Sequence, residues 1–207
     1  MISAIAIILL LFILPVVLVY FKIVPFKYRV HLLILVSAIA AVIMIFQKWT
    51  LAKLELGVDI VGKYVTFYLL FTLILAILLI IAAKLQRKGF KAQWWRDNHF
   101  LYGFILVSVL QEFLFRGFLI PQLKEIVGSY IVVILLNASL FAIMHLIYIN
   151  DTQSMAMIFI GGLGFATMYV YFPSLILIII SHAILNFIAV LFGYYSTERP
   201  PERLSTA

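Results

Sequence analysis

Glu112 and Arg116 place a carboxylate and a guanidinium inside an apolar run at about residues 100 to 120. An ionised side chain near the centre of a bilayer costs roughly 2.5 to 3.5 kcal/mol on insertion scales, so such residues usually face the interior of a helix bundle and carry function. Because the two residues are four apart, they share one face of a helix and can partly neutralise each other.

Two histidines lie in later apolar runs, each with a partner on the same helix face. His145 follows Phe141 by four residues, and Asn186 follows His182 by four. Taken singly, each group has a structural explanation: a hydrogen-bonded packing histidine, an interhelical amide or a structural ion pair. Taken together, ionisable groups gathered in a site of low dielectric constant indicate acid-base chemistry.

The composition indicates that these groups belong to a membrane protein. The 207 residues are 66% hydrophobic and 11% charged, with a mean hydropathy of +1.21, whereas about a quarter of residues are charged in soluble domains. We therefore predict an all-α, polytopic membrane helix bundle with about seven transmembrane helices. The absence of cysteine excludes disulfides and thiolate sites.

The charge pattern predicts an orientation in the membrane. Basic residues concentrate in the connections at 22–30 and 84–99, which indicates a cytoplasmic C-terminus and an N-terminus outside. The net charge of +7 is explained by this orientation and by attraction to anionic lipids, so we expect no nucleic-acid partner. We also expect no cleaved signal peptide. The predicted helical runs are 2–21, 31–47, 64–83, 100–120, 130–149, 155–172 and 174–193.

Several local features are predicted from proline, glycine and tryptophan. Pro15 predicts a kink in the first helix, and Pro173 predicts a tight turn between the last two. Gly162 and Ala166 predict close helix packing. The basic connector that ends at Phe100 contains Trp94 and Trp95 and suits the cytoplasmic headgroup layer.

The predicted helix ends place the polar groups at uneven depths. Glu112 lies past the middle of the fourth run, whereas His145 lies close to the inner end of the fifth. We therefore expect the fifth helix to continue beyond Ile149, or the fourth helix to be shorter and tilted.

Three ordered motifs support a family resemblance. Gln-Glu-x-x-x-Arg at 111–116, Phe-x-x-x-His at 141–145 and His-x-x-x-Asn at 182–186 resemble the motif set of the CAAX-protease and bacteriocin-processing (CPBP/Abi) family, which includes the type II CAAX prenyl endopeptidases. The resemblance covers about residues 100–193. It divides the chain into an N-terminal part with three helices and the basic connector (1–99), a catalytic helix core (100–193) and a short cytoplasmic tail (194–207).

The resemblance implies an intramembrane peptidase in a bacterial cell membrane, with a cavity open toward the cytosolic leaflet. Its substrate would be a peptide or a prenylated, membrane-proximal protein. In this family a motif-one glutamate and the motif-two histidine, here His145, activate a water. The motif-three residues, here His182 and Asn186, stabilise the oxyanion, and Arg116 would keep a carboxylate ionised. Phe141 is a supporting residue of the second motif.

Gln111 departs from the family pattern. The family has Glu-Glu-x-x-x-Arg, and the first glutamate is the one assigned to water activation, whereas an amide cannot act as a general base. Three explanations stay open: an inactivated variant of a protease, transfer of the role to Glu112, or a natural pseudoprotease kept for binding. Glu112 points about 100° away from Gln111 around the helix, which counts against a simple transfer. The alternative function is a non-catalytic membrane binder, such as a bacteriocin-immunity or regulatory protein.

Other chemistries have weaker support in the sequence. The His-Glu-x-x-His motif of zinc proteases is absent, but a zinc site made by Glu112, His145 and His182 is an alternative. No other cofactor is expected. Ser181 projects in a different direction from His182, which disfavours a serine mechanism. A proton-coupled transporter is a third possibility, disfavoured by the nearly featureless first three helices.

Overall fold

The computed structural model describes residues 2–91, 94, 98–147 and 152–194. Within these residues the secondary structure is entirely helical, as predicted. The seven successive helical stretches are α1 (Ile2–Ile8) with a π-helical turn (Leu9–Ile13) and α2 (Leu14–Tyr20); α3 (Arg29–Phe46); α4 (Val58–Leu85); α5 (Asn98–Glu112) with a π-helical segment (Phe113–Leu119) and α6 (Ile120–Val127); α7 (Tyr130–Met144); α8 (Thr152–Tyr171); and α9 (Leu175–Leu191).

These helices have the composition of membrane spans. Among the described residues, five stretches are long and apolar enough to cross a bilayer, and the helices Ala4–Tyr20 and Leu175–Leu191 are shorter but also apolar. Many large apolar side chains on the outer surface are exposed, including Phe46 at 81% and Ile45 at 74%. Such a surface is stable in lipid and not in water. The chain is therefore an integral membrane protein.

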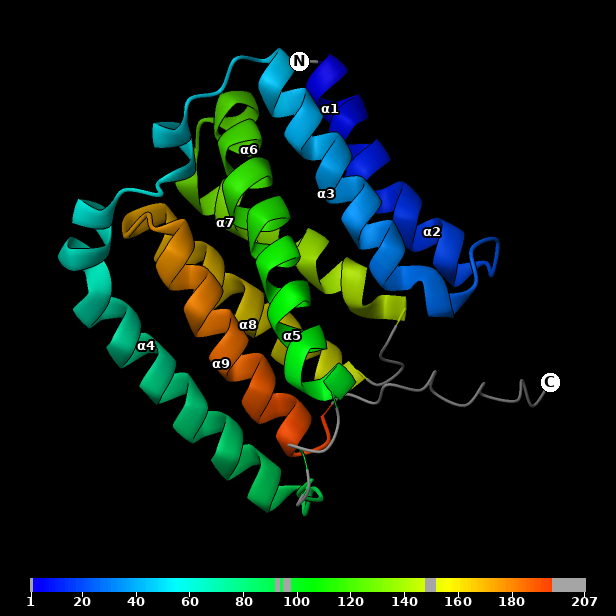
Figure 1. The fold of residues 1–207 in the computed structure, drawn as a ribbon, viewed down its shortest axis with the longest axis vertical. Helices are drawn as coiled ribbons and strands as arrows, with labels where there is room; N and C mark the ends of the chain where they lie inside the picture. Colours follow the sequence, from blue (N-terminus) through cyan, green and yellow to red (C-terminus); the bar gives the residue numbers. More distant parts are fainter. Residues whose placement is uncertain (1, 92–93, 95–97, 148–151, 195–207) are drawn as a thin grey trace.

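The helix formed by α5 and α6 is the centre of the bundle (Figure 1). Helix α3 packs on one side of it, with α1 and α2 on that same side, and α8 and α9 lie on the other. Helix α4 stands at the outer edge and packs mainly against α9. The central helix therefore separates an N-terminal side from a side built by α4, α8 and α9.

The fourth helical stretch is longer than predicted, and the fifth is shorter. The fourth continues through the π-helical segment to Val127, where Gly128 at φ 72° ends it in a left-handed cap that suits glycine. Glu112 therefore lies near the middle of this stretch. Helix α7 ends at Met144 and is followed by a 3₁₀ turn, His145–Ile147; Ile149 lies outside the described residues. The expected extension of the fifth helix and shortening of the fourth were both wrong.

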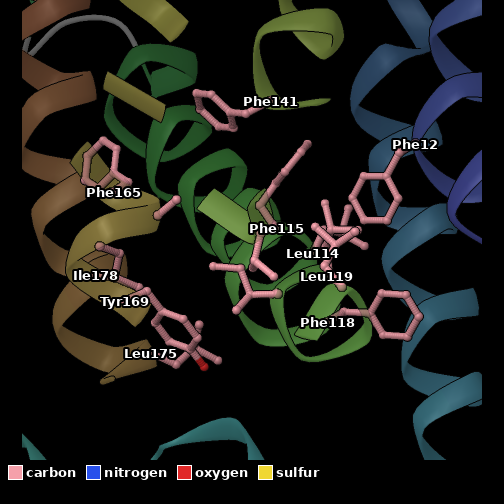
Figure 2. Close-up of a cluster of buried hydrophobic side chains, with 14 of the residues drawn as sticks. Phe12, Leu114, Phe115, Phe118, Leu119, Phe141, Phe165, Tyr169, Leu175 and Ile178 are labelled. Carbon is pink, nitrogen blue, oxygen red and sulfur yellow. The ribbon is translucent and has the colours of Figure 1, made fainter. Parts of the chain in front are cut away.

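The two π-helical segments face each other. Phe12 in the first and Phe115 in the second are fully buried, and their rings meet edge to face at 5.1 Å. The first π turn directly precedes Pro15, whose missing N–H prevents a regular α-helical hydrogen bond. A π turn therefore lies beside Pro15, and the predicted kink stays a prediction. Figure 2 shows these phenylalanines in the cluster of buried apolar side chains around the central helix.

Close packing between α7 and α8 depends on Gly162. A Cβ atom at this position would lie 3.3 Å from the Cα of Ala138, so a side chain would press on the backbone of α7. Ala166, one turn further along α8, is completely buried. The small-residue interface predicted for α8 is confirmed. After Tyr171 the chain turns sharply into α9, whose first turn is capped by the Ser174 hydroxyl.

The connector after α4 packs on the core through Trp94. Its ring meets Phe187 of α9 edge to face at 5.1 Å. Trp95 and the tail after Tyr194 lie outside the described residues.

Candidate active site

Glu112 and Arg116 form a completely buried ion pair on the central helix. Glu112 is the last residue of α5, and Arg116 lies in the π-helical segment that follows. Arg116 Nη1 donates to Glu112 Oε1 at 3.2 Å, and neither side chain is exposed. Removing one partner of such a pair leaves an uncompensated buried charge, so the two residues depend on each other for stability.

Arg116 is also held by the neighbouring helices. Its Nη2 donates to the Gly162 carbonyl of α8 at 3.5 Å. The guanidinium lies 4.8 Å from the ring centroid of Phe141 and 5.4 Å from that of Phe165. Aromatic faces stabilise a desolvated cation. The positive charge is therefore accommodated by a carbonyl and two rings as well as by Glu112.

His182 joins helix α9 to this ion pair. Its Nδ1 lies 2.5 Å from Glu112 Oε1. A carboxylate paired with a guanidinium accepts hydrogen bonds, so we assign the proton of the neutral imidazole to Nδ1. That assignment leaves the lone pair on Nε2, as in a histidine oriented by a carboxylate for general-base catalysis.

His145 lies at the C-terminal end of α7, where helix carbonyls lack helical partners. Its Nδ1 is 2.8 Å from the Phe141 carbonyl oxygen, which can only accept, so Nδ1 is again the protonated nitrogen. The Phe141 ring contacts both histidines, with centroid distances of 4.6 Å to His145 and 5.9 Å to His182. The second motif thus fixes the orientation of His145 and fills the space between the two imidazoles.

Asn186 lies one turn beyond His182 and binds a residue that the sequence reasoning missed. Its Nδ2 donates to Ser108 Oγ at 3.0 Å, and Ser108 Oγ donates to the Phe104 carbonyl at 2.7 Å. One N–H of the Asn186 amide is therefore bound to Ser108, and this bond fixes the orientation of the amide. The available signal was its spacing, since Ser108 precedes Glu112 by four residues and shares its helix face.

One cavity of about 270 Å³ connects these groups. His145, His182 and Asn186 line it, together with Phe141. The remaining wall is mostly apolar and is made by residues of α4, α8 and α9 and by Tyr194 beyond α9. Such a combination of an apolar wall and a few convergent polar groups is typical of a ligand site.

Two hydrogen bonds hold helix α4 beside this cavity. Thr72 Oγ1 donates to Ser181 Oγ at 2.7 Å, and the Tyr68 hydroxyl donates to the Phe172 carbonyl at 2.9 Å. Ser181 is therefore directed away from His182, as the sequence predicted. These contacts hold the apolar wall formed by Leu75, Leu78 and Leu79.

Gln111 lies outside this cavity. It is 5% exposed and lines a separate cavity of about 30 Å³ on the N-terminal side of the central helix. The other lining residues include Leu11 and Val36, with Arg29 and Met144. The structure therefore brings together Glu112, Arg116, His145, His182 and Asn186, whereas Gln111 faces the N-terminal helices.

A metal site fits this arrangement poorly. Within the described ranges, no three His, Cys, Asp or Glu side chains lie close enough to share a metal ion. Glu112 is engaged with Arg116 and His182, and His145 uses Nδ1 on a carbonyl. The zinc site stays a hypothesis, which an experiment with a chelator would test.

The sequence that carries these residues matches the model of a known family. A family model described as type II CAAX prenyl endopeptidase Rce1-like matches residues 93–188. Residues 93–188 form a domain of this family. All three motifs lie inside the matched Rce1-like domain. Comparisons with curated proteins and with solved structures found no match.

Proposed function

We propose that this chain is an intramembrane endopeptidase of the CAAX-processing type, which cuts a membrane-proximal peptide with a water activated in the cavity of His145 and His182. The observation that carries the proposal is the contact between His182 Nδ1 and Glu112 Oε1 at 2.5 Å. It directs Nε2 of an oriented imidazole away from the carboxylate, and His182, His145 and Asn186 line the same cavity.

In the proposed reaction His182 is the general base. Its Nε2 takes a proton from water as the water oxygen attacks the peptide carbonyl, and Glu112 stabilises the imidazolium that forms. Collapse of the tetrahedral intermediate breaks the C–N bond, and the imidazolium returns its proton to the leaving amine. We assign His145 to orienting the water or the scissile peptide.

This assignment differs from the roles that the family resemblance implied for His182. A neutral imidazole whose Nδ1–H faces Glu112 has no second N–H for an oxyanion. It gains one only after it has taken the proton from water. Asn186 uses one amide N–H on Ser108, and its second N–H is the proposed donor to the oxyanion. Such a donor is typically worth about 10² to 10³ in rate.

The proposed substrate is apolar as well as peptidic. Leu75 and Leu78 of α4 and Met157 and Ile158 of α8 line the cavity beside the two histidines, and this wall suits a hydrocarbon chain. A prenylated peptide, or an apolar peptide at the membrane surface, matches this lining and the name of the family. The bilayer is the second partner, with the basic connections proposed to face the cytoplasm.

Gln111 supports a second candidate function, a non-catalytic membrane binder of the immunity or regulatory type. An amide stands where the family has its first glutamate, and this amide cannot activate water. Its position in the separate cavity beside Leu11 favours the peptidase, because the polar groups around His182 are complete without it.

Purified protein in liposomes would test the peptidase directly. Prenylated and unmodified fluorogenic peptides are given to the wild type, to His182→Ala and to His31→Ala, a control at an exposed histidine. We expect cleavage by the wild type and the control, and a loss of about 10²- to 10⁴-fold in His182→Ala. Binding without cleavage by the wild type would support the binder, and loss of cleavage on adding a chelator would support a metal mechanism.

A further inference from the structure

The π-helical segment of the central helix holds Arg116 through an irregular backbone hydrogen bond. The Ile120 N–H donates to the carbonyl of Phe115, five residues earlier, whereas a regular α-helix joins residues four apart. This carbonyl belongs to the peptide bond between Phe115 and Arg116. Its position therefore determines where the Arg116 side chain leaves the helix.

A side chain of α7 binds the same carbonyl. Asn137 Nδ2 donates to the Phe115 carbonyl oxygen at 2.7 Å, and Asn137 is completely buried. A carbonyl oxygen has two lone pairs, so it can accept from Asn137 and from Ile120 together. Within a bilayer such groups depend on protein partners, because lipid tails offer none. The amide thus ties α7 to the irregular turn of the central helix.

Asn137 begins a row of residues on α7 that leads to the candidate active site. Phe141 and His145 follow it at intervals of four. The Phe141 ring meets the Phe115 ring edge to face at 5.2 Å and lies 4.8 Å from the Arg116 guanidinium. His145 lines the cavity. One row of α7 therefore contacts the π-helical segment, the buried cation and the cavity in turn.

A shift of the Phe115 carbonyl would be transmitted to His182. Arg116 Nη1 and His182 Nδ1 contact the same atom, Glu112 Oε1, so a movement of Arg116 disturbs the hydrogen bond that orients the imidazole. A misplacement of about 1 Å can lower a rate by about 10²-fold. Asn137 is not among the described residues that line the cavity. Its effect would therefore reach the site through the central helix.

We propose that Asn137 is a positioning residue, whose amide fixes the π-helical turn so that Glu112 is held against His182. The inference rests on the proposed peptidase function and adds a residue outside the three motifs to it. Helix α7 then positions both imidazoles, because it carries His145 itself and orients His182 through the Phe115 carbonyl. An amide that only joined two helices would affect stability and leave the rate of the folded protein unchanged.

Cleavage kinetics separate positioning from helix packing. Asn137→Leu removes the donor and keeps a branched side chain of similar shape; it is compared with the wild type in liposomes on a prenylated fluorogenic peptide. We expect kcat to fall about 10- to 100-fold while KM changes by less than about twofold, because the cavity lining is unchanged. Asn137→Ser, which is smaller and too short to reach the carbonyl, should show the same fall and replaces Asn137→Leu if that variant does not fold.

Gln122→Met is the matched control on the central helix. Gln122 is also a buried amide, and its Nε2 donates to Gln47 Oε1 at 2.8 Å, but it lies beyond the π-helical segment in α6. We expect it to lower thermal stability as Asn137→Leu does and to keep kcat within about twofold of the wild type. A change in kcat of less than about threefold in the Asn137 variants, or an equal fall in Gln122→Met, would overturn the proposal.

Proton NMR tests the positioning without catalysis. In protein with isotope-labelled histidine, the Nδ1 proton between His182 and Glu112 should give a far-downfield signal, as protons in short hydrogen bonds to carboxylates do. Its loss in His182→Ala assigns the signal. We expect it to be lost or shifted upfield in Asn137→Leu and kept in Gln122→Met.

The two readouts distinguish this proposal from the proposed function. If the wild type cuts no peptide but the NMR signal follows the expected pattern, the positioning role stands and the peptidase fails. If the wild type cuts the peptide but the signal is absent from it, or is unchanged in Asn137→Leu, the peptidase stands and the positioning role fails.

Discussion

The two sides of the central helix differ sharply although their key residues are neighbours. Glu112 faces α9 and joins Arg116 and His182 in a buried network of charge, whereas Gln111 faces α2 and α3 in a small, mostly apolar cavity. One residue turns the helix by about 100°, and that rotation is enough to place adjacent polar groups in different environments. Adjacent members of a motif therefore need not act at the same site.

Glu112→Gln should produce the largest effect on the network side. It leaves the Arg116 guanidinium buried without its counter-charge, which typically costs about 3–5 kcal/mol, and it removes the carboxylate that stabilises protonated His182. We expect loss of cleavage and a matching loss of stability, measured by denaturant unfolding in detergent micelles. Glu125→Gln is the control: its ion pair with Lys53 is 61% exposed at the glutamate, so the cost should be below about 1 kcal/mol. Equal stability of Glu112→Gln and wild type would contradict the proposed interdependence.

Gly162→Ala tests how tightly the network side is packed. The new Cβ would lie 3.3 Å from the Ala138 Cα, and a backbone atom cannot move aside as a flexible side chain can. Overpacking of this kind typically costs about 1–3 kcal/mol, and it would also shift the carbonyl that binds Arg116. Thermal unfolding in detergent provides the measurement.

Gly161→Ala is the matched control for Gly162→Ala. A Cβ at Gly161 meets no atom within 4 Å, so the change should leave stability unaltered or raise it by about 0.4–1 kcal/mol. If both variants lose the same stability, the contact with Ala138 does not explain the loss.

Thr72→Val tests how helix α4 is attached to the network side. Loss of its hydrogen bond leaves the buried Ser181 hydroxyl without its partner in α4, and we expect a cost of about 1 kcal/mol. Thr66→Val makes the same change at an exposed position of α4 and should be nearly neutral. Differential scanning fluorimetry of the two variants is sufficient, and indistinguishable melting temperatures would show that this bond does not hold α4.

Gln111→Glu should produce the smallest effect, because it changes the N-terminal side. If the chemistry belongs to Glu112 and His182, the cleavage rate should change by less than about threefold, or about 0.65 kcal/mol. A gain of 10²-fold or more would assign water activation to position 111 and identify the chain as an inactivated variant. The assay is cleavage of a prenylated peptide by matched preparations of both proteins.

The helical class and the grouping of polar residues could be predicted from the sequence. The apolar runs predicted the helices, and the four-residue spacings of Glu112 with Arg116 and of His182 with Asn186 predicted shared faces. The small-residue pattern at Gly162 predicted close helix packing, and the structure shows that α8 makes this contact with α7. Each of these signals is local to one helix, which is why it can be read from residue spacing.

The features that could not be predicted depend on contacts between helices or on irregular turns. The π-helical segment at Phe113–Leu119 has no periodicity of its own. The fourth helix was predicted to end at 120, where the apolar run is interrupted by Gln122, Lys124 and Glu125, although α6 continues to Val127. The bond between Ser108 and Asn186 joins residues that are 78 apart, and only the fold reveals it. The separation of Gln111 from the histidines likewise needed the positions of α2 and α3.

The π-helical segment of the central helix has a consequence for changes in chain length. A π turn accommodates one more residue than an α turn. Deleting one residue after Arg116, within Gly117–Leu119, would relax the segment to a regular α-helix while the Glu112–Arg116 spacing stays at four. Deleting one between Phe113 and Phe115 would shorten that spacing to three. The chain should therefore tolerate a single-residue deletion on one side of Arg116 and lose the geometry of the Glu112–Arg116 ion pair when the deletion falls on the other.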